Sequence, residues 1–247
     1  METMEILKKS TVEGNIVKLP DIQLDRKQYL EVKNKLELIG GKWKGGKTAG
    51  FVFEENPTEL INQISNGRDV NLKKEFQFFE TPEKIADMLV SHADIQDDDS
   101  ILEPSAGRGV IIEAINRVKD FKLVDCYEIM ELNRSFLEKL DTSNVIGSDF
   151  LKSEKLNSYH KIIANPPFSK NQDIIHVRKM YECLMPGGTL VSIMSNHWKT
   201  SQNRKETEFR AWLASQNHQG YELDSEEFKE SGTKISTCII VIIKPLA

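Results

Sequence analysis

An apolar run ends abruptly at residue 165, where the chain reads HKIIANPPFSKNQ from His160 to Gln172. Two consecutive prolines donate no backbone N–H and fix φ near about −65°, so a strand must stop there and its end is stiff. A stiff strand end would hold the Asn165 amide and the Phe168 ring in fixed positions. An ordinary strand-terminating turn uses the same residue types, so the tetrapeptide alone leaves both interpretations open.

A glycine loop follows another apolar run, in LEPSAGRGV at residues 102–110. Gly107 and Gly109 let the backbone turn sharply and approach a ligand at the carboxyl end of a strand, where open α/β sheets bind their ligands. The third glycine of a dinucleotide fingerprint is absent, since Ile112 stands in its place, and no phosphate-binding GKS/T sequence exists. We therefore expect a ligand that is not held through a pyrophosphate.

Acidic residues end the next two predicted strands. Glu128 lies about twenty residues beyond the glycine loop, where a carboxylate can accept both hydroxyls of a ribose. The following strand ends at Asp149 and Phe150, an acceptor for an adenine amino group and a ring to lie on the base. Each acid alone could be a solvated surface residue, but three successive strand ends favour a ligand site. These strand ends imply a ligand with an adenosine and no phosphate. S-adenosylmethionine fits that description, and its sulfonium methyl would be directed to the strand end at Asn165.

Strands and helices alternate from residue 76 onward, which predicts an α/β fold with a doubly wound, mostly parallel sheet. The candidate strands read SILEP, KLVDCYE, NVIG, KIIAN, TLVSIM and STCIIVIIK, and the candidate helices span 82–91, 109–118, 131–140, 174–184 and 204–215. Such sheets often carry an antiparallel strand at one edge, and we assign STCIIVIIK to that position.

Residues 1–75 predict a small α+β module before the larger domain at residues 76–247. Its pattern is a strand at NIVKLP, a helix at DRKQYLEVKNKLELIGG, a hairpin in GKWKGGKTAGFVF and a helix at NPTELINQISNG. Basic and aromatic side chains on the hairpin could grip a nucleic-acid backbone, although a solvated hairpin has the same composition. The candidate contacts are Lys42, Trp43, Lys44 and Lys47.

Composition and net charge limit the classes of protein to which this chain can belong. The 247-residue chain has a net charge of −5, and residues 1–75 hold 13 basic against 12 acidic side chains, so the larger domain carries −6. This balance argues against tight non-specific nucleic-acid binding, which depends on neutralising phosphates. No membrane span or signal peptide is visible, and the three cysteines lack ligand spacing. We expect a cytoplasmic protein without a metal, and a monomer.

The order of these motifs resembles a known enzyme family. FFETP, LEPSAGRG, YE, SDF and NPPF follow one another as in the γ-ordered class I adenine-N6 DNA methyltransferases, over roughly residues 76–245. The resemblance implies a Rossmann-like, seven-stranded methyltransferase sheet and S-adenosylmethionine as cofactor. It also implies double-stranded DNA as partner, with the target base turned out of the duplex.

The resemblance assigns roles to residues of this sequence. Thr81 and Pro82 would hold the methionine carboxylate, Glu128 the ribose hydroxyls, and Asp149 with Phe150 the adenine. The methionine and ribose would face Glu103, Pro104, Ser105, Ala106, Gly107 and Gly109. The catalytic residues would be Asn165, Pro166, Pro167 and Phe168, and Phe228 would form a second wall of the base pocket. Many members of the family have Tyr where this chain has Phe168. The Phe ring can still stack on the base, but it cannot make a contact that would need the Tyr hydroxyl.

The chemistry of an adenine amine explains the catalytic tetrapeptide. Its lone pair is delocalised into the ring, so it attacks a sulfonium poorly unless acceptors draw it toward a more tetrahedral geometry. The Asn165 amide oxygen and the Pro166 carbonyl would be those acceptors, held by the stiff prolines. Phe168 would stack on the extruded base, because the target atom cannot be reached inside a duplex.

Two other functions remain open from the sequence. NPPY/F also occurs in release-factor glutamine methyltransferases and in some RNA methyltransferases, so the acceptor could be protein glutamine or RNA adenine. A non-catalytic nucleic-acid-binding relict of the same fold is the third interpretation, although the intact Asn165, Glu128 and Asp149 argue against decay. The sequence does not identify a target sequence or a biological role.

Overall fold

The computed structural model describes residues 2–53, 56–66, 81–120, 123–224 and 235–246. The chain divides into two compact units, Met1–Phe78 and Phe79–Ala247, and each is described by itself. The expected module boundary near residue 75 lies outside the described residues.

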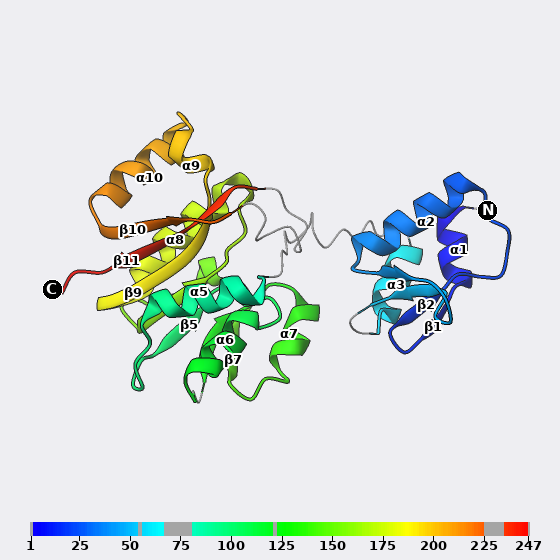
Figure 1. The fold of residues 1–247 in the computed structure, drawn as a ribbon, viewed down its shortest axis with the longest axis horizontal. Coiled ribbons are helices and arrows are strands. Elements are labelled where there is room, and N and C mark those ends of the chain that lie inside the picture. Colours follow the sequence, from blue (N-terminus) through cyan, green and yellow to red (C-terminus); the bar gives the residue numbers. More distant parts are fainter. Residues whose placement is uncertain (1, 54–55, 67–80, 121–122, 225–234, 247) are drawn as a thin grey trace. The chain divides into compact units, whose positions relative to one another are not determined.

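The larger unit is built on one sheet (Figure 1). Its described residues form seven strands in the order β10-β11-β9-β8-β5-β6-β7. β5 to β9 run parallel, and β10 and β11 are antiparallel to their neighbours. The mostly parallel, doubly wound sheet predicted from the sequence is confirmed. The strands are β5 (Ile101–Glu103), β6 (Val124–Tyr127), β7 (Ser143–Gly147), β8 (Tyr159–Ala164), β9 (Leu184–Ser195), β10 (Asn217–Glu222) and β11 (Thr237–Ile243).

The edge position predicted for STCIIVIIK was wrong. This segment forms β11, which is antiparallel as expected but lies between β9 and β10. Six of its residues, Thr237–Ile242, are buried, because both faces of an interior strand are covered. The edge strand is β10, whose residues are all exposed and mostly polar, so its sequence has none of the alternation that marks a half-buried strand.

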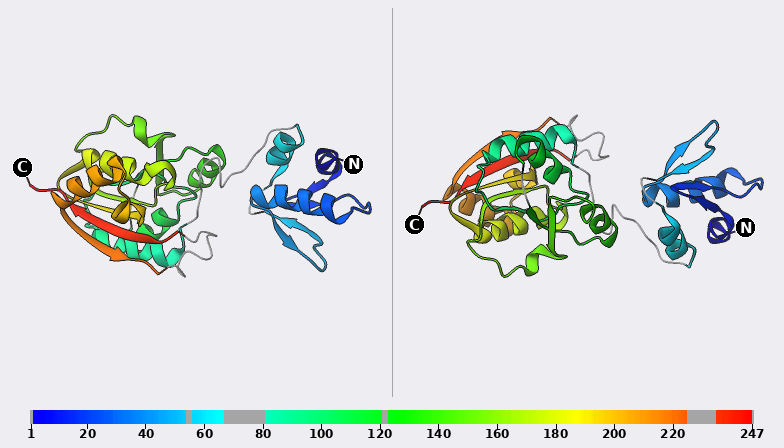
Figure 2. Two further views of the ribbon diagram at one scale, coloured as in Figure 1. Left: turned by 90° about the horizontal axis from the view of Figure 1, so that it is seen from above. Right: turned by 90° about the horizontal axis from the view of Figure 1, so that it is seen from below.

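Helices cover both faces of the sheet. α5 (Glu83–Ala93), α6 (Val110–Val118) and α7 (Glu131–Leu137) contribute to one buried cluster, which includes Ile85, Ile111 and Leu137. α8 (Gln172–Cys183) and α10 (Arg204–Ala214) pack on the other face, where Val177 and Phe209 are buried. In Figure 2, β11 lies between α8 and α10 on one side and α5 on the other. The five predicted helices are all present.

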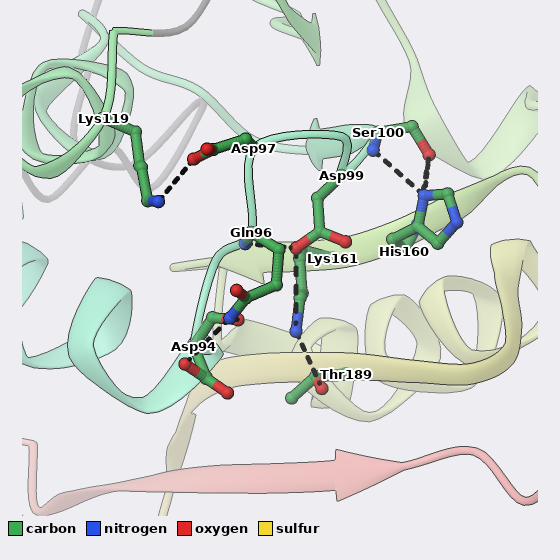
Figure 3. A network of polar contacts seen from close by, with 9 residues as sticks. All are labelled: Asp94, Gln96, Asp97, Asp99, Ser100, Lys119, His160, Lys161 and Thr189. Atoms are coloured by element: carbon green, nitrogen blue, oxygen red, sulfur yellow. Dashed lines mark hydrogen bonds and ion pairs between the residues drawn. The ribbon is translucent and has the colours of Figure 1, made fainter.

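A network of polar side chains ties together the amino ends of the central strands (Figure 3). Lys161 of β8 lies 3.8 Å from the Asp99 carboxylate and 3.5 Å from the Thr189 hydroxyl, and the Lys161 and Asp99 side chains are each 11% exposed. The Ser100 N–H donates to Nδ1 of His160 at 3.1 Å. These contacts join the segment before β5 to β8 and β9 at the end opposite to the predicted site.

The smaller unit combines three helices with a four-stranded antiparallel sheet of order β1-β2-β4-β3 in its described residues. Its elements are α1 (Thr3–Lys9), β1 (Thr11–Glu13), β2 (Ile16–Lys18), α2 (Arg26–Leu38), β3 (Lys42–Lys44), β4 (Gly50–Val52) and α3 (Thr58–Ser65). α1 and β1 were not predicted. Asp25 caps α2 through a reciprocal capping box with Gln28. The buried core of this unit includes Val32, Leu36 and Phe51.

Candidate active site

The predicted cofactor and catalytic residues lie at one edge of the larger sheet. β5, β6, β7 and β8 are parallel, so their carboxyl ends meet at that edge. Glu103 ends β5, Glu128 directly follows β6, Asp149 lies two residues beyond β7, and Asn165 directly follows β8. The site is therefore assembled from four segments that the sheet brings into register.

The glycine loop is held by the neighbouring strand end. Gly107 has φ of +56°, and its N–H donates to Oε2 of Glu128 at 2.7 Å. The Ala106 N–H donates to the Tyr127 carbonyl at 2.9 Å. Gly109 has φ of +93°, and a Cβ there would lie 2.5 Å from Cδ1 of Leu140, so no side chain fits without a shift. Glycine therefore suits both positions, where the positive φ would strain most other residues.

Glu128 is buried and uses both carboxylate oxygens to hold the backbone. Oε1 accepts the Met130 N–H at 2.7 Å, and Oε2 accepts the Gly107 N–H. Burial raises its pKa, while the bonds from Met130 and Gly107 oppose that shift. The Asn133 side chain also donates to this carboxylate, so of its roughly four acceptor sites at least one is left for a ligand hydroxyl.

Glu103 is only 1% exposed, and its Oε2 has no hydrogen-bond partner within the described residues. Its carboxyl accepts the backbone N–H of Ile112 in the first turn of α6. Burial, and then the nearby charge of Glu128, raise the pKa of Glu103 well above its ordinary value. A buried acceptor without a partner is costly, which fits a site that a polar or cationic ligand group completes.

Asp149 and Phe150 occupy a short turn after β7. Oδ1 of Asp149 accepts the Leu151 N–H at 3.1 Å and so caps the 3₁₀ turn η1 (Phe150–Lys152). The Phe150 ring is buried, with ring centroids 5.5 Å from Tyr127 and 5.9 Å from His176. The predicted contact of this ring with adenine stays a prediction.

Asn165 is contacted from two other segments. Its Nδ2 donates to the Thr81 hydroxyl at 3.0 Å, and its backbone carbonyl accepts the Ser105 hydroxyl at 3.2 Å. Pro82 occupies the N-cap position of α5 beside Thr81. Of the other catalytic candidates, Pro166 is buried, and Pro167 and Phe168 are half-buried. Phe168 packs on the cluster formed with α5 and α6, so the tetrapeptide is a braced structure.

The segment after the tetrapeptide is strained. Lys170 and Asn171 have φ of +54° and +60°, a region that residues other than glycine rarely adopt. Asp173 follows at the start of α8 and accepts the N–H and the hydroxyl of Ser195 at 3.0 and 2.8 Å. Glu206 hydrogen-bonds Asn171, Asn203 and Ser201, and together these bonds outweigh burial and lower its pKa to about 2. Two buried acids thus brace this turn against β9 and α10.

Several site residues could not be found from the sequence. The contact between Thr81 and Asn165 joins positions 84 residues apart. Ile129 is 55% exposed although it is apolar and directly follows Glu128, which makes it a candidate surface for a flat ligand ring. The acid Glu206 lies in a polar helix sequence and gives no motif.

The remaining predicted contacts lie elsewhere or outside the described residues. Phe228 falls in residues 225–234, outside the described ranges. On the hairpin of the smaller unit, Lys42, Lys44 and Lys47 are exposed and Trp43 is 45% exposed. Trp43 packs edge-on against Phe51, and because side chains alternate along β3, the two strand lysines project from the opposite face.

A family model described as "Methyltransferase small domain" matches residues 80–224, more than half of the chain. The chain belongs to the methyltransferase small domain family. The matched range contains the four strand ends that carry the site. It stops before β11 and does not include the smaller unit.

Solved structures share the fold of this family member at low sequence identity. A putative class I S-adenosylmethionine-dependent methyltransferase from Listeria monocytogenes has a TM-score of 0.57 and 12% identity over 76% of this chain and 66% of its own. The EcoKI M protein of a type I restriction enzyme has a TM-score of 0.58 and 16% identity, over 98% of this chain and 56% of its own. A type I restriction-modification methyltransferase subunit from Streptococcus thermophilus has a TM-score of 0.56 and 15% identity, over 67% of this chain and 44% of its own.

These matches establish the fold of class I S-adenosylmethionine-dependent methyltransferases. The chain spans between 44% and 66% of the length of these three proteins. Within the described ranges, no helix is long and apolar enough to cross a bilayer, and no group of His, Cys, Asp or Glu side chains could hold a metal ion. Cys126, Cys183 and Cys238 are buried free thiols.

Proposed function

We propose that this methyltransferase family member transfers a methyl group from S-adenosylmethionine to the N6 amino group of adenine in DNA, on a base turned out of the duplex. One observation carries the proposal: the Asn165 amide lies at the end of β8, directly beside the β5 strand end that bears Glu103 and the glycine loop. The side chain that would accept hydrogen bonds from a planar amine and the proposed cofactor site are thereby neighbours at one edge of the sheet.

The residues present fit the cofactor. Glu103 offers a buried carboxylate oxygen without a partner in the described residues, and Glu128, which accepts bonds from Met130, Gly107 and Asn133, retains acceptor capacity for a ribose hydroxyl. The α-amino group and the ribose of S-adenosylmethionine supply those two kinds of donor. When bound, the cofactor supplies an electrophilic methyl group, and the electrons of the methyl–sulfur bond leave with sulfur as the N6 lone pair forms the new bond.

Asn165 and Pro166 orient the target amine. The Asn165 amide oxygen and the Pro166 carbonyl would each accept one N–H, which turns the lone pair out of the ring plane and toward the methyl group. The amine loses a proton to water only after the new bond has formed and has made it acidic. A strong general base is therefore not required.

Phe168 and the smaller unit would hold the DNA. Stacking of a base on an aromatic ring is worth about 1 to 3 kcal/mol, a useful part of the cost of extruding the base. Exposed lysines of the β3–β4 hairpin would contact phosphates. Type I restriction-modification methyltransferase proteins among the solved structures support DNA as the acceptor class.

The test is transfer of labelled methyl from S-adenosylmethionine into genomic DNA that lacks adenine methylation, followed by nucleoside analysis. We expect label in N6-methyladenine. Asn165→Ala should reduce transfer at least about 10²-fold, as loss of one preorganised polar group at a reacting centre commonly does. Binding of S-adenosylhomocysteine to Asn165→Ala, measured by calorimetry, is the control for an intact fold.

The same assay offered RNA and release factor as acceptors separates the competing functions. Label in either acceptor with none in DNA would replace the proposal by RNA or glutamine methylation. Absence of label in all three, with cofactor binding intact, would favour the non-catalytic relict.

A further inference from the structure

Thr81 contacts the side chain on which the proposed chemistry depends. It directly precedes Pro82 and α5, is 9% exposed, and accepts a hydrogen bond from Nδ2 of Asn165 at 3.0 Å. The resemblance implied for Thr81 a contact with the cofactor's methionine carboxylate. The observed contact is with the catalytic candidate itself.

This contact restrains the plane of the amide, and in the structure it is Nδ2 that faces the Thr81 hydroxyl. An Asn side chain can rotate about its last torsion, and its oxygen and nitrogen have opposite hydrogen-bonding roles. With Nδ2 directed at the Thr81 hydroxyl, Oδ1 is held on the opposite side of the amide. The backbone of Asn165 is fixed as well, because Ser105 donates to its carbonyl at 3.2 Å and Pro166 follows it.

We propose that Thr81 is a positioning residue that fixes the Asn165 amide with its oxygen toward the target amine. The inference rests on the proposed function and deepens it. Without the hydroxyl, the amide loses this restraint, and rotations that present N–H donors to an amine that needs acceptors become more accessible. Asn165 then reaches its productive orientation only part of the time.

Kinetics with saturating S-adenosylmethionine separate this role from a role in cofactor binding. Thr81→Val keeps the shape of the side chain but cannot accept the bond, and we expect single-turnover methyl transfer to slow by about tenfold. Thr81→Ser keeps a hydroxyl and should retain the rate within about twofold. Thr189→Val is the matched control, because Thr189 is 8% exposed and lies at the opposite end of the sheet.

A double-mutant cycle tests whether Thr81 acts through Asn165. In an Asn165→Ala background, Thr81→Val should cause no further loss, since the group it positions is gone. Equal losses in both backgrounds would overturn the inference. A normal rate for Thr81→Val at saturation, with only weaker S-adenosylhomocysteine binding, would also overturn it and leave Thr81 with the cofactor alone.

A second readout does not depend on activity. The side-chain amide signal of Asn165 can be identified by NMR from its loss in Asn165→Ala. It should shift and exchange faster with water in Thr81→Val but not in Thr81→Ser, and an unchanged signal would contradict the inference. If wild-type protein methylates no DNA, the proposed function fails, while this measurement still decides whether Thr81 holds the amide.

Discussion

At the scale of single residues, the proposed cofactor site contains two buried carboxyl groups that repel each other. Glu103 and Glu128 end neighbouring parallel strands, and each has a raised pKa, for which burial is the main cause. A carboxyl whose folded-state pKa is raised stabilises the fold when it is protonated. That stabilisation is complete below the unfolded pKa and is lost as pH rises through the folded pKa. Without a ligand, ionised Glu103 therefore weakens the protein it serves.

Glu103→Gln should raise the melting temperature of the ligand-free protein at pH 8. The difference from wild type should shrink as pH falls through the raised folded pKa and should be smallest below 4.5, the ordinary pKa of a glutamate, because wild-type Glu103 is then mostly protonated in both states. Binding of S-adenosylmethionine should weaken, since the cofactor is cationic and the amide is not an anion. Thermal unfolding across pH, with calorimetry at pH 8, measures both effects.

Parallel melting profiles of the two proteins across this pH range would contradict the predicted role of Glu103.

Residue types predicted part of this site, and only part. Glu128 and Asp149 could be predicted because each follows an apolar run and parallel strand ends meet at one edge, whereas Glu103 was expected only from the resemblance. Contacts between predicted residues could not be predicted: Thr81 and Asn165 were both expected in the site, but no local sequence pattern indicates the hydrogen bond that joins them across 84 positions.

At the scale of elements, the amino ends of the central strands hold a polar network, whereas the carboxyl ends bear the candidate site. Lys161 joins Asp99 to Thr189 across adjacent segments, in a cluster far along β8 from Asn165. Lys161→Met should destabilise the fold by about 1 to 3 kcal/mol, because it leaves a nearly buried carboxylate without its cation. Affinity for S-adenosylhomocysteine should be unchanged.

Chemical denaturation and calorimetry measure these two quantities. Lys119→Met is the matched control, because Lys119 pairs with Asp97, whose side chain is 81% exposed, and such surface pairs contribute less than about 1 kcal/mol. Equal destabilisation by both substitutions would show that burial of the Lys161 pair has no special effect.

Elements with a clear apolar period were predictable, and those without one were not. α5, α6, α7, α8 and α10 each have buried apolar positions on one face and were expected. β10 reads NHQGYE with every residue exposed, and its pairing depends on β11 beside it. The continuous run of buried residues in β11 is typical of an interior strand. The sequence therefore indicated an interior position, and the predicted edge position was wrong.

At the scale of the whole molecule, the smaller unit has a nearly neutral charge balance, whereas residues 76–247 carry −6. If its hairpin contacts DNA, replacing Lys42, Lys44 and Lys47 with Ala should weaken DNA binding. The slope of log affinity against log salt should become shallower by up to about 0.9 for each phosphate that the variant no longer neutralises. Cofactor affinity should stay the same. Fluorescence anisotropy at several salt concentrations measures the slope.

A triple variant at Lys8, Lys9 and Lys27 removes the same charge from exposed positions of the same unit. A salt slope that falls equally in both triple variants would mean that the unit acts only through its overall charge, and an unaltered slope would leave the hairpin without a role in DNA binding.

The path of the chain through the sheet has one more consequence. β5, β6 and β7 bear the acids predicted to hold the cofactor, all before residue 150, whereas β8 begins the stretch that bears Asn165. The two stretches meet along the β5–β8 ladder, and residues 154–157 between them are exposed. A chain cut after Glu154 would therefore yield two polypeptides, each with whole strands and neither with a complete site. Methylation by a mixture of the two would then report their reassembly, as in a split enzyme.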